Sequence, residues 1–277
     1  MEAVPEGDGM MESVRVPTVD GLSLAAVLSR GRRADVIIWL HGISVNKDEY
    51  LGFFRDGATR FKSKDISSIR FHFRGHGESD GSSLDFSVIA QILDLQAIMR
   101  LAEREFGLSA RIHLVAASFG APPAVFAAAR YPTRVHSVSL IAPVLSYQRT
   151  FLNPETEWTR ELFSAEKLQL LDETGRLYFD SAFCIGPRLV EEMRLLSPIA
   201  TLASLRQPVL VIHGNRDSMV PYDATVQACS GLEHVRLVTL KGADHGFMQE
   251  GDEEGVSPQS VANKAKIFRL IEEQLGC

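Results

Sequence analysis

Ser118 is the residue of this chain whose surroundings point most directly to chemistry. It ends a run of β-forming residues, within Ala116-Ala117-Ser118-Phe119-Gly120. A serine hydroxyl is a useful nucleophile only when a base takes its proton and the side chain stands clear of the sheet. A sharp strand-to-helix turn written G-x-S-x-G meets the second need, and its small residues let the two backbones approach closely. The alternative is a serine that caps the following helix, which is common.

The base for this serine is expected among the histidines that follow it, because sites of this kind run serine, acid, histidine along the chain. They are His136, His213, His234 and His245. His136 and His234 lead into predicted strands, where a proton shuttle would be badly placed, and His213 closes a strand. His245 lies on a loop just past the last predicted strand, where the base is needed. Its alternative role is that of an exposed polar loop residue.

The acid that orients this imidazole is predicted to be Asp217, in the turn directly after the buried strand VLVIHG. A site of this kind needs the acid after one strand and the base after the next strand, with a helix between them, and this chain has that order. Asp244 is adjacent to the histidine but poorly placed to hold its ring, and Asp223 falls inside the following helix.

Two backbone amides are expected to stabilise the negative charge that develops on the substrate oxygen. One is the N–H of Phe119, the residue after the nucleophile. The other should come from the loop after the strand DVIIWLHG, and we assign it to Ile43. His41 is expected to brace that loop rather than to handle protons.

A framework of alternating strands and helices is predicted to position these residues. The runs SVRVPTV and LSLAAVLSR flank Asp20-Gly21 and indicate a hairpin. Nearly all-apolar runs such as DVIIWLHG are typical of strands covered on both faces. Residues 86–107, 119–130 and 257–275 have apolar residues at helical spacing. The alternation predicts an α/β fold with a mainly parallel sheet wound on both faces.

The chain is expected to divide into a mobile tail at residues 1–10, a core made of residues 11–145 and 201–277, and an insertion at residues 146–200. The insertion contains helical material and no convincing strand. We interpret it as a cap over the carboxyl edge of the sheet, where open α/β sheets bind ligands; additional core helices are the alternative. Several aromatic residues either line an acyl or aryl pocket or form the cap's own core: Trp158, Tyr178, Phe179 and Phe183.

Composition and charge narrow the class of partner. The net charge is −6 at pH 7, without a block of Lys or Arg, which argues against a nucleic acid or an anionic membrane. Three widely spaced cysteines suggest neither disulfides nor a metal site, and residues 73–81 lack a phosphate-loop GK[ST] and a metal-ligand spacing. We expect no membrane span, because the apolar runs are too short, and we do not expect the acidic N-terminus to be a signal peptide. We expect a cytoplasmic protein without metal or cofactor that acts on a small molecule; a homodimer is compatible with the sequence.

Five motifs at predicted strand ends together resemble the α/β-hydrolase superfamily over nearly the whole chain: WLHGIS, FRGHGESDG, VAASFGA, IHGNRDSMVP and GADHGF. Within it, the chain is similar to the small serine esterases of the cinnamoyl and feruloyl type that carry a short inserted cap. The resemblance implies a catalytic triad of Ser118, Asp217 and His245, with the amides of Ile43 and Phe119 as oxyanion hole. It also implies hydrolysis of carboxylic esters without a metal or organic cofactor.

Three features depart from the family pattern. Members typically have GHSQGG where this chain has AASFGA, and the S-F-G triplet is also found in carbon–carbon bond hydrolases. Pro122-Pro123 predicts an irregular helix start. The cap aromatics do not align with the family's substrate contacts, so no contact is carried over to them. The expected reaction is cleavage of an uncharged acyl or aryl ester through an acyl-enzyme. The alternatives are a carbon–carbon bond hydrolase, thioesterase or lactonase with the same triad, and, in another class, a ligand-binding protein on a hydrolase scaffold.

Overall fold

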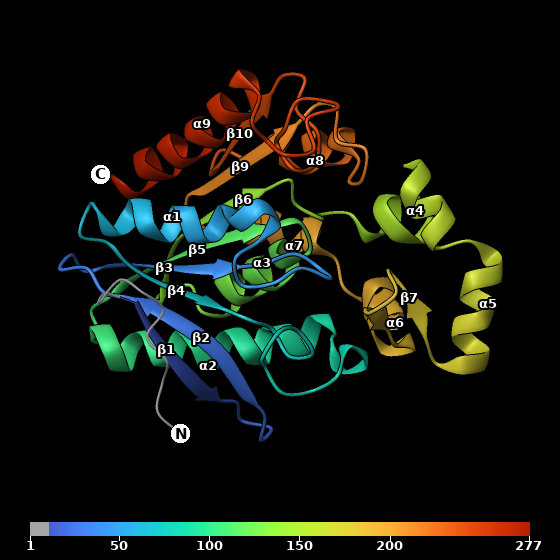
Figure 1. Ribbon diagram of the computed structural model, residues 1–277, viewed down its shortest axis with the longest axis horizontal. Helices are drawn as coiled ribbons and strands as arrows, with labels where there is room; N and C mark the ends of the chain where they lie inside the picture. Colours follow the sequence, from blue (N-terminus) through green and yellow to red (C-terminus); the bar gives the residue numbers. More distant parts are fainter. Residues whose placement is uncertain (1–10) are drawn as a thin grey trace.

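One twisted sheet runs through the middle of the molecule (Figure 1). The computed structural model describes residues 11–277, and the expected tail, residues 1–10, lies outside the described residues. The strand order is β1-β2-β4-β3-β5-β6-β9-β10. The strands are β1 (Met11–Pro17), β2 (Ser23–Ser29), β3 (Asp35–Leu40), β4 (Ser67–Phe71), β5 (Arg111–Ala117), β6 (Val135–Ile141), β9 (Val209–Gly214) and β10 (Val235–Leu240).

The pairing of these strands confirms the predicted α/β fold. β1 and β2 form the expected antiparallel hairpin, and β2 also runs antiparallel to β4. All the other neighbours in the sheet are parallel. The carboxyl ends of six parallel strands therefore lie along one edge, which is where an open α/β sheet builds its binding crevice.

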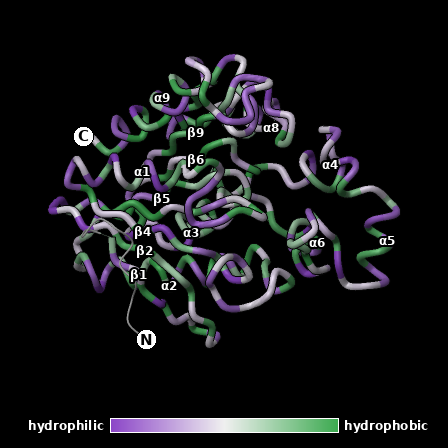
Figure 2. Tube along the Cα trace, viewed as in Figure 1, coloured by the Kyte–Doolittle hydropathy of each residue, from purple (hydrophilic) through white to green (hydrophobic). Residues whose placement is uncertain are grey.

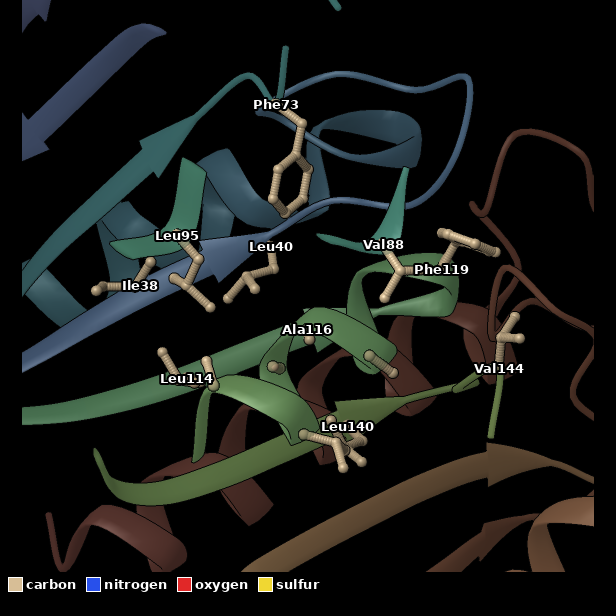
Figure 3. Close-up of a cluster of buried hydrophobic side chains, with 14 of the residues drawn as sticks. Ile38, Leu40, Phe73, Val88, Leu95, Leu114, Ala116, Phe119, Leu140 and Val144 are labelled. Carbon is tan, nitrogen blue, oxygen red and sulfur yellow. The ribbon is translucent and has the colours of Figure 1, made fainter. Parts of the chain in front are cut away.

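Helices cover both faces of the sheet (Figure 1). One face carries α1 (Phe53–Lys62) and α9 (Pro258–Leu275), and the other carries α2 (Val88–Phe106), α3 (Ala121–Arg130), α7 (Pro198–Ser204) and α8 (Tyr222–Cys229). Side chains alternate along a strand, so Ile38 and Leu40 enter the core under α2 and α3 while Ile37 and Trp39 enter the core under α1 and α9. Figure 3 shows Ile38 and Leu40 in the first of these cores.

The two cores explain the apolar runs in the sequence. Every residue of β3 and of β9 is buried, as expected for strands with helices on both sides. Figure 2 shows hydrophobic residues concentrated along the central strands and hydrophilic ones toward the outer helices and loops. No helix within residues 11–277 is long and apolar enough to cross a membrane.

Residues 146–200 lie beyond the end of the sheet toward which β3 points (Figure 1). The segment contains the π-helical turn η4 (Gln148–Leu152), α4 (Glu157–Leu162), α5 (Ala165–Thr174), β7 (Leu177–Tyr178), β8 (Cys184–Ile185) and α6 (Pro187–Leu195), and it runs into α7. The expectation that it has no strand is wrong, because β7 and β8 pair antiparallel. Each is only two residues long, too short to leave an alternating pattern in the sequence.

Candidate active site

Ser118 stands on a sharp turn between β5 and α3. Its φ of 49° lies in the left-handed region that non-glycine residues rarely adopt. A short 3-10 turn, η3 (Ser118–Gly120), precedes α3, so the irregular helix start predicted from the two prolines is confirmed. At Gly120 a Cβ atom would clash with the carbonyl oxygens of Leu40 and His41. The glycine lets α3 start against the end of β3, which keeps the serine at the carboxyl edge of the sheet.

The structure brings the three predicted side chains together. His245 Nε2 lies 3.1 Å from Ser118 Oγ, and His245 Nδ1 lies 2.7 Å from Asp217 Oδ2. Asp217 follows β9 and His245 follows β10, so parallel strands place both at the edge that Ser118 occupies. Because the Asp217 carboxylate only accepts hydrogen bonds, it holds the proton on Nδ1 and leaves Nε2 free to accept the Ser118 proton.

Asp217 is fully buried, and four donors surround its carboxylate. Oδ2 accepts from His245 and from His213 Nε2 at 2.8 Å, and Oδ1 accepts from the amides of Met219 and Val220 at 2.8 and 2.7 Å. Burial alone would raise the pKa of this carboxyl, but His245 and His213 outweigh burial and hold the pKa well below 3.8. The carboxylate is therefore charged at neutral pH.

His245 is the less enclosed partner, with 17% of its side chain exposed. Burial disfavours its charged form, but Asp217, Glu49 and Asp244 outweigh burial and raise the pKa of the imidazole above its ordinary value near 6.5. The raised pKa makes the imidazole a stronger base toward the proton of Ser118.

The loop after β3 lies against the nucleophile. A Cβ atom on Gly42 would sit 3.3 Å from Ser118 Cβ. His41 Nε2 accepts from the Phe73 amide at 3.0 Å, so its Nδ1 carries the proton and donates to the Gly42 carbonyl at 2.7 Å. His41 thus braces the loop, as expected. Ile43 and Phe119 both line the cavity in front of Ser118; their role as oxyanion amides stays a prediction.

A cavity of about 400 Å³ opens in front of Ser118 and His245, within the usual size range of small-molecule sites. Its walls come from the loop after β3, the end of β6, the turn after β9 and the loop 244–253. Of the aromatic residues in segment 146–200, Phe151 and Trp158 line it. Phe179 packs against Phe183 instead, and Tyr178 is half exposed. Of the expected set, Trp158 therefore has the lining role, Phe179 and Phe183 pack against each other, and Tyr178 has neither role.

The remaining candidates lie where the sequence placed them. Asp244 accepts hydrogen bonds from Ser218 and from the His245 backbone amide, and its carboxylate does not hold the ring. Asp223 lies inside α8. His113, which was not among these candidates, is buried and lies within hydrogen-bond distance of Ser137 and Asp35.

Sequence reasoning missed the roles of two groups next to these residues. The first is His213, the second donor to Asp217 Oδ2; its spacing of four residues from Asp217 across the turn was the available signal. The second is Glu49, which lines the cavity and contributes to the pKa of His245. No motif marks Glu49, because it reaches the site only through the path of its loop.

Comparisons with known proteins show which family the chain is similar to. The model of the Alpha/beta hydrolase family matches residues 37–258. The mouse monoacylglycerol lipase ABHD6 is 25% identical over 192 residues, which cover 68% of this chain and 50% of that protein. The chain thus spans about half the length of the ABHD6 relatives that it matches. The AB hydrolase superfamily protein YisY of Bacillus subtilis is 23% identical over 246 residues, covering 78% and 87% of the two chains.

Among solved structures, Est1E from Butyrivibrio proteoclasticus with bound ferulic acid is similar at a TM-score of 0.73. The two chains are 18% identical, and the match covers 95% of this chain and 100% of that one. Mouse alpha/beta hydrolase domain-containing protein 10 is similar at a TM-score of 0.71 and 18% identity, with 96% and 98% covered. At these identities the likeness shows a shared fold.

Proposed function

The chain belongs to the alpha/beta hydrolase family, and on that premise we propose that it is a serine hydrolase that cleaves carboxylic esters through an acyl-enzyme. The observation that carries the proposal is the hydrogen-bonded chain from Ser118 through His245 to the buried carboxylate of Asp217, at the floor of a cavity. The name monoacylglycerol lipase of the ABHD6 relative, and the ferulic acid bound to Est1E, support the same reaction class.

In the proposed reaction, Ser118 Oγ attacks the ester carbonyl carbon while His245 Nε2 takes its proton. The carbonyl oxygen becomes an oxyanion facing the amides of Ile43 and Phe119. The tetrahedral intermediate collapses, the bond to the alcohol oxygen breaks, and His245 gives its proton to the departing alcohol. Water then attacks the acyl-enzyme with His245 again as base, which releases the acid and restores Ser118.

Segment 146–200 is proposed to act as the cap of this site, over a core made of residues 11–145 and 201–277. Phe151 and Trp158 extend from it into the cavity lining. Phe151 also packs against Phe119, the residue next to the nucleophile. These contacts support an apolar or aromatic acyl group as substrate.

The first test is labelling with a fluorophosphonate, an electrophile that phosphonylates an activated serine hydroxyl. We expect one adduct per chain by intact mass, mapped to Ser118 by peptide mass spectrometry. Turnover of short and medium p-nitrophenyl esters should accompany it. An adduct without ester turnover would move the substrate toward carbon–carbon bonds, thioesters or lactones. Absence of any adduct would overturn the nucleophile assignment and favour a ligand-binding protein.

The charge of the cavity leads to a prediction about substrates. Its lining contains no Lys or Arg among the described residues, but it contains four acids: Glu49, Asp244, Asp252 and Glu253. A negatively charged acyl group would be repelled in this partly enclosed space. We expect kcat/KM for p-nitrophenyl hemisuccinate to be at least about 10-fold below that for p-nitrophenyl methyl succinate, its uncharged ester. Equal values at low salt would contradict this prediction.

A further inference from the structure

Glu49 reaches back along its own loop to the backbone next to the nucleophile. Its Oε2 accepts a hydrogen bond from the Gly42 amide at 2.8 Å, and its Oε1 accepts from the Tyr50 amide at 3.3 Å. Its φ of 60° is in the left-handed region, although it is not a glycine. Such a backbone conformation persists only where surrounding contacts hold it. The loop therefore keeps a strained residue whose carboxylate is directed at Gly42.

Both sides of Gly42 are held, and this determines where the next amide points. Glu49 binds the Gly42 N–H, and His41 Nδ1 donates to the Gly42 carbonyl. That carbonyl belongs to the same planar peptide as the Ile43 N–H. In a trans peptide the carbonyl and the N–H point in opposite directions, so the Ile43 N–H points away from His41. Ile43 is also a residue of the cavity lining.

Glu49 and His245 also line the same cavity. Three carboxyl groups raise the pKa of that imidazole: Asp217 in the turn after β9, whose Oδ2 lies 2.7 Å from Nδ1, then Glu49 in the loop after β3 and Asp244 in the histidine's own loop. All three favour the protonated ring. Burial raises the pKa of Glu49 itself, against the hydrogen bonds from Gly42 and Tyr50 and the charge of His245.

We propose that Glu49 is a positioning residue of the active site: it clamps Gly42 so that the Ile43 amide is held at the oxyanion position, and its charge stabilises the protonated form of His245. This inference rests on the proposed function, because it assigns a role in the same reaction. The clamp needs a hydrogen-bond acceptor, whereas the effect on His245 needs a negative charge. Two substitutions separate these requirements.

The experiment compares Glu49→Gln, Glu49→Ala and the charge control Glu254→Gln. Glu254 is exposed on the neighbouring loop and lies outside the cavity lining. For each variant, kcat, KM, the pH profile of kcat/KM, the rate of fluorophosphonate labelling and the melting temperature are measured. Glutamine keeps an acceptor for the Gly42 N–H, and alanine removes both acceptor and charge.

We expect Glu49→Ala to lower kcat and the labelling rate by about 10- to 100-fold, with KM changed less than about threefold, because a displaced oxyanion donor acts on the transition state. Glu49→Gln should keep at least about a third of kcat. It should also shift the acidic limb of the profile to lower pH, because the neutral form of His245 then persists further into acid. Glu254→Gln should leave all of these unchanged.

Three results would overturn the proposal. In the first, the labelling rate and kcat of Glu49→Ala are within twofold of wild type. In the second, Glu49→Gln loses as much kcat as Glu49→Ala, and its acidic limb does not shift. If Glu49→Ala does not fold, the proposal is overturned when the acidic limb of the kcat/KM profile of Glu49→Gln lies at the same pH as in wild type. A wild-type protein that takes no fluorophosphonate would instead overturn the proposed function, and the role of Glu49 with it.

Discussion

Replacing Ser118 by alanine is expected to lower kcat for ester hydrolysis by at least about 10⁴-fold, because the nucleophile of such a triad carries most of its rate enhancement. The fold should be unaffected. Ser118 loses only the hydroxyl bonded to His245, and alanine at a φ of 49° bears the same backbone strain as serine. The measurements are initial rates on a p-nitrophenyl ester, intact mass after fluorophosphonate treatment, and a thermal melt.

A second serine in the same chain provides the matched control. Ser137 Oγ lies 2.7 Å from His113 Nδ1, and His113 Nε2 lies 3.0 Å from Asp35 Oδ1. This is also a Ser-His-Asp chain, but all three residues are buried at the other end of the strands, away from the cavity. Ser137→Ala should therefore keep ester turnover and the fluorophosphonate adduct. Loss of the adduct in Ser137→Ala, or its survival in Ser118→Ala, would contradict the assignment.

These two Ser-His-Asp arrangements show why the candidate site could be predicted from the sequence. Ser118, Asp217 and His245 each follow a strand with a clear apolar pattern. Parallel strands bring their carboxyl ends to one edge, so residues far apart in sequence were expected side by side. His113 lies within a strand instead, and a side chain there enters a core rather than a crevice.

Helix α1 and the position of Glu49 could not be predicted from the sequence, because tertiary contacts determine both. Gly57 falls in the middle of α1 and weakens its helical signal. The structure explains the glycine, because a Cβ atom there would clash with the ring of Trp39. Glu49 is placed by a left-handed turn whose only sign in the sequence is a polar loop. Neither contact could be read from periodicity.

Replacing Asp217 by asparagine is expected to lower kcat/KM by about 10³- to 10⁴-fold. The carboxylate accepts from two ring nitrogens on Oδ2 and from two amides on Oδ1. Asparagine has one acceptor oxygen, and if it serves the two amides its NH₂ group faces His245. His245 must then accept at Nδ1 and carry its proton on Nε2, where it can no longer take the proton of Ser118.

The pH profile separates this effect from a general loss of structure. Activity requires neutral His245, so kcat/KM falls as the pH drops through the pKa of that group. Because Asp217 raises this pKa, the wild-type acidic limb should lie above the ordinary histidine value near 6.5, and the residual activity of Asp217→Asn should have its limb at lower pH. Asp244→Asn is the control, since its carboxylate binds Ser218 and the His245 backbone but not the ring. The kcat/KM of Asp244→Asn should fall by less than about 10-fold. A fall as large as that of Asp217→Asn would mean that the acid has been assigned to the wrong residue.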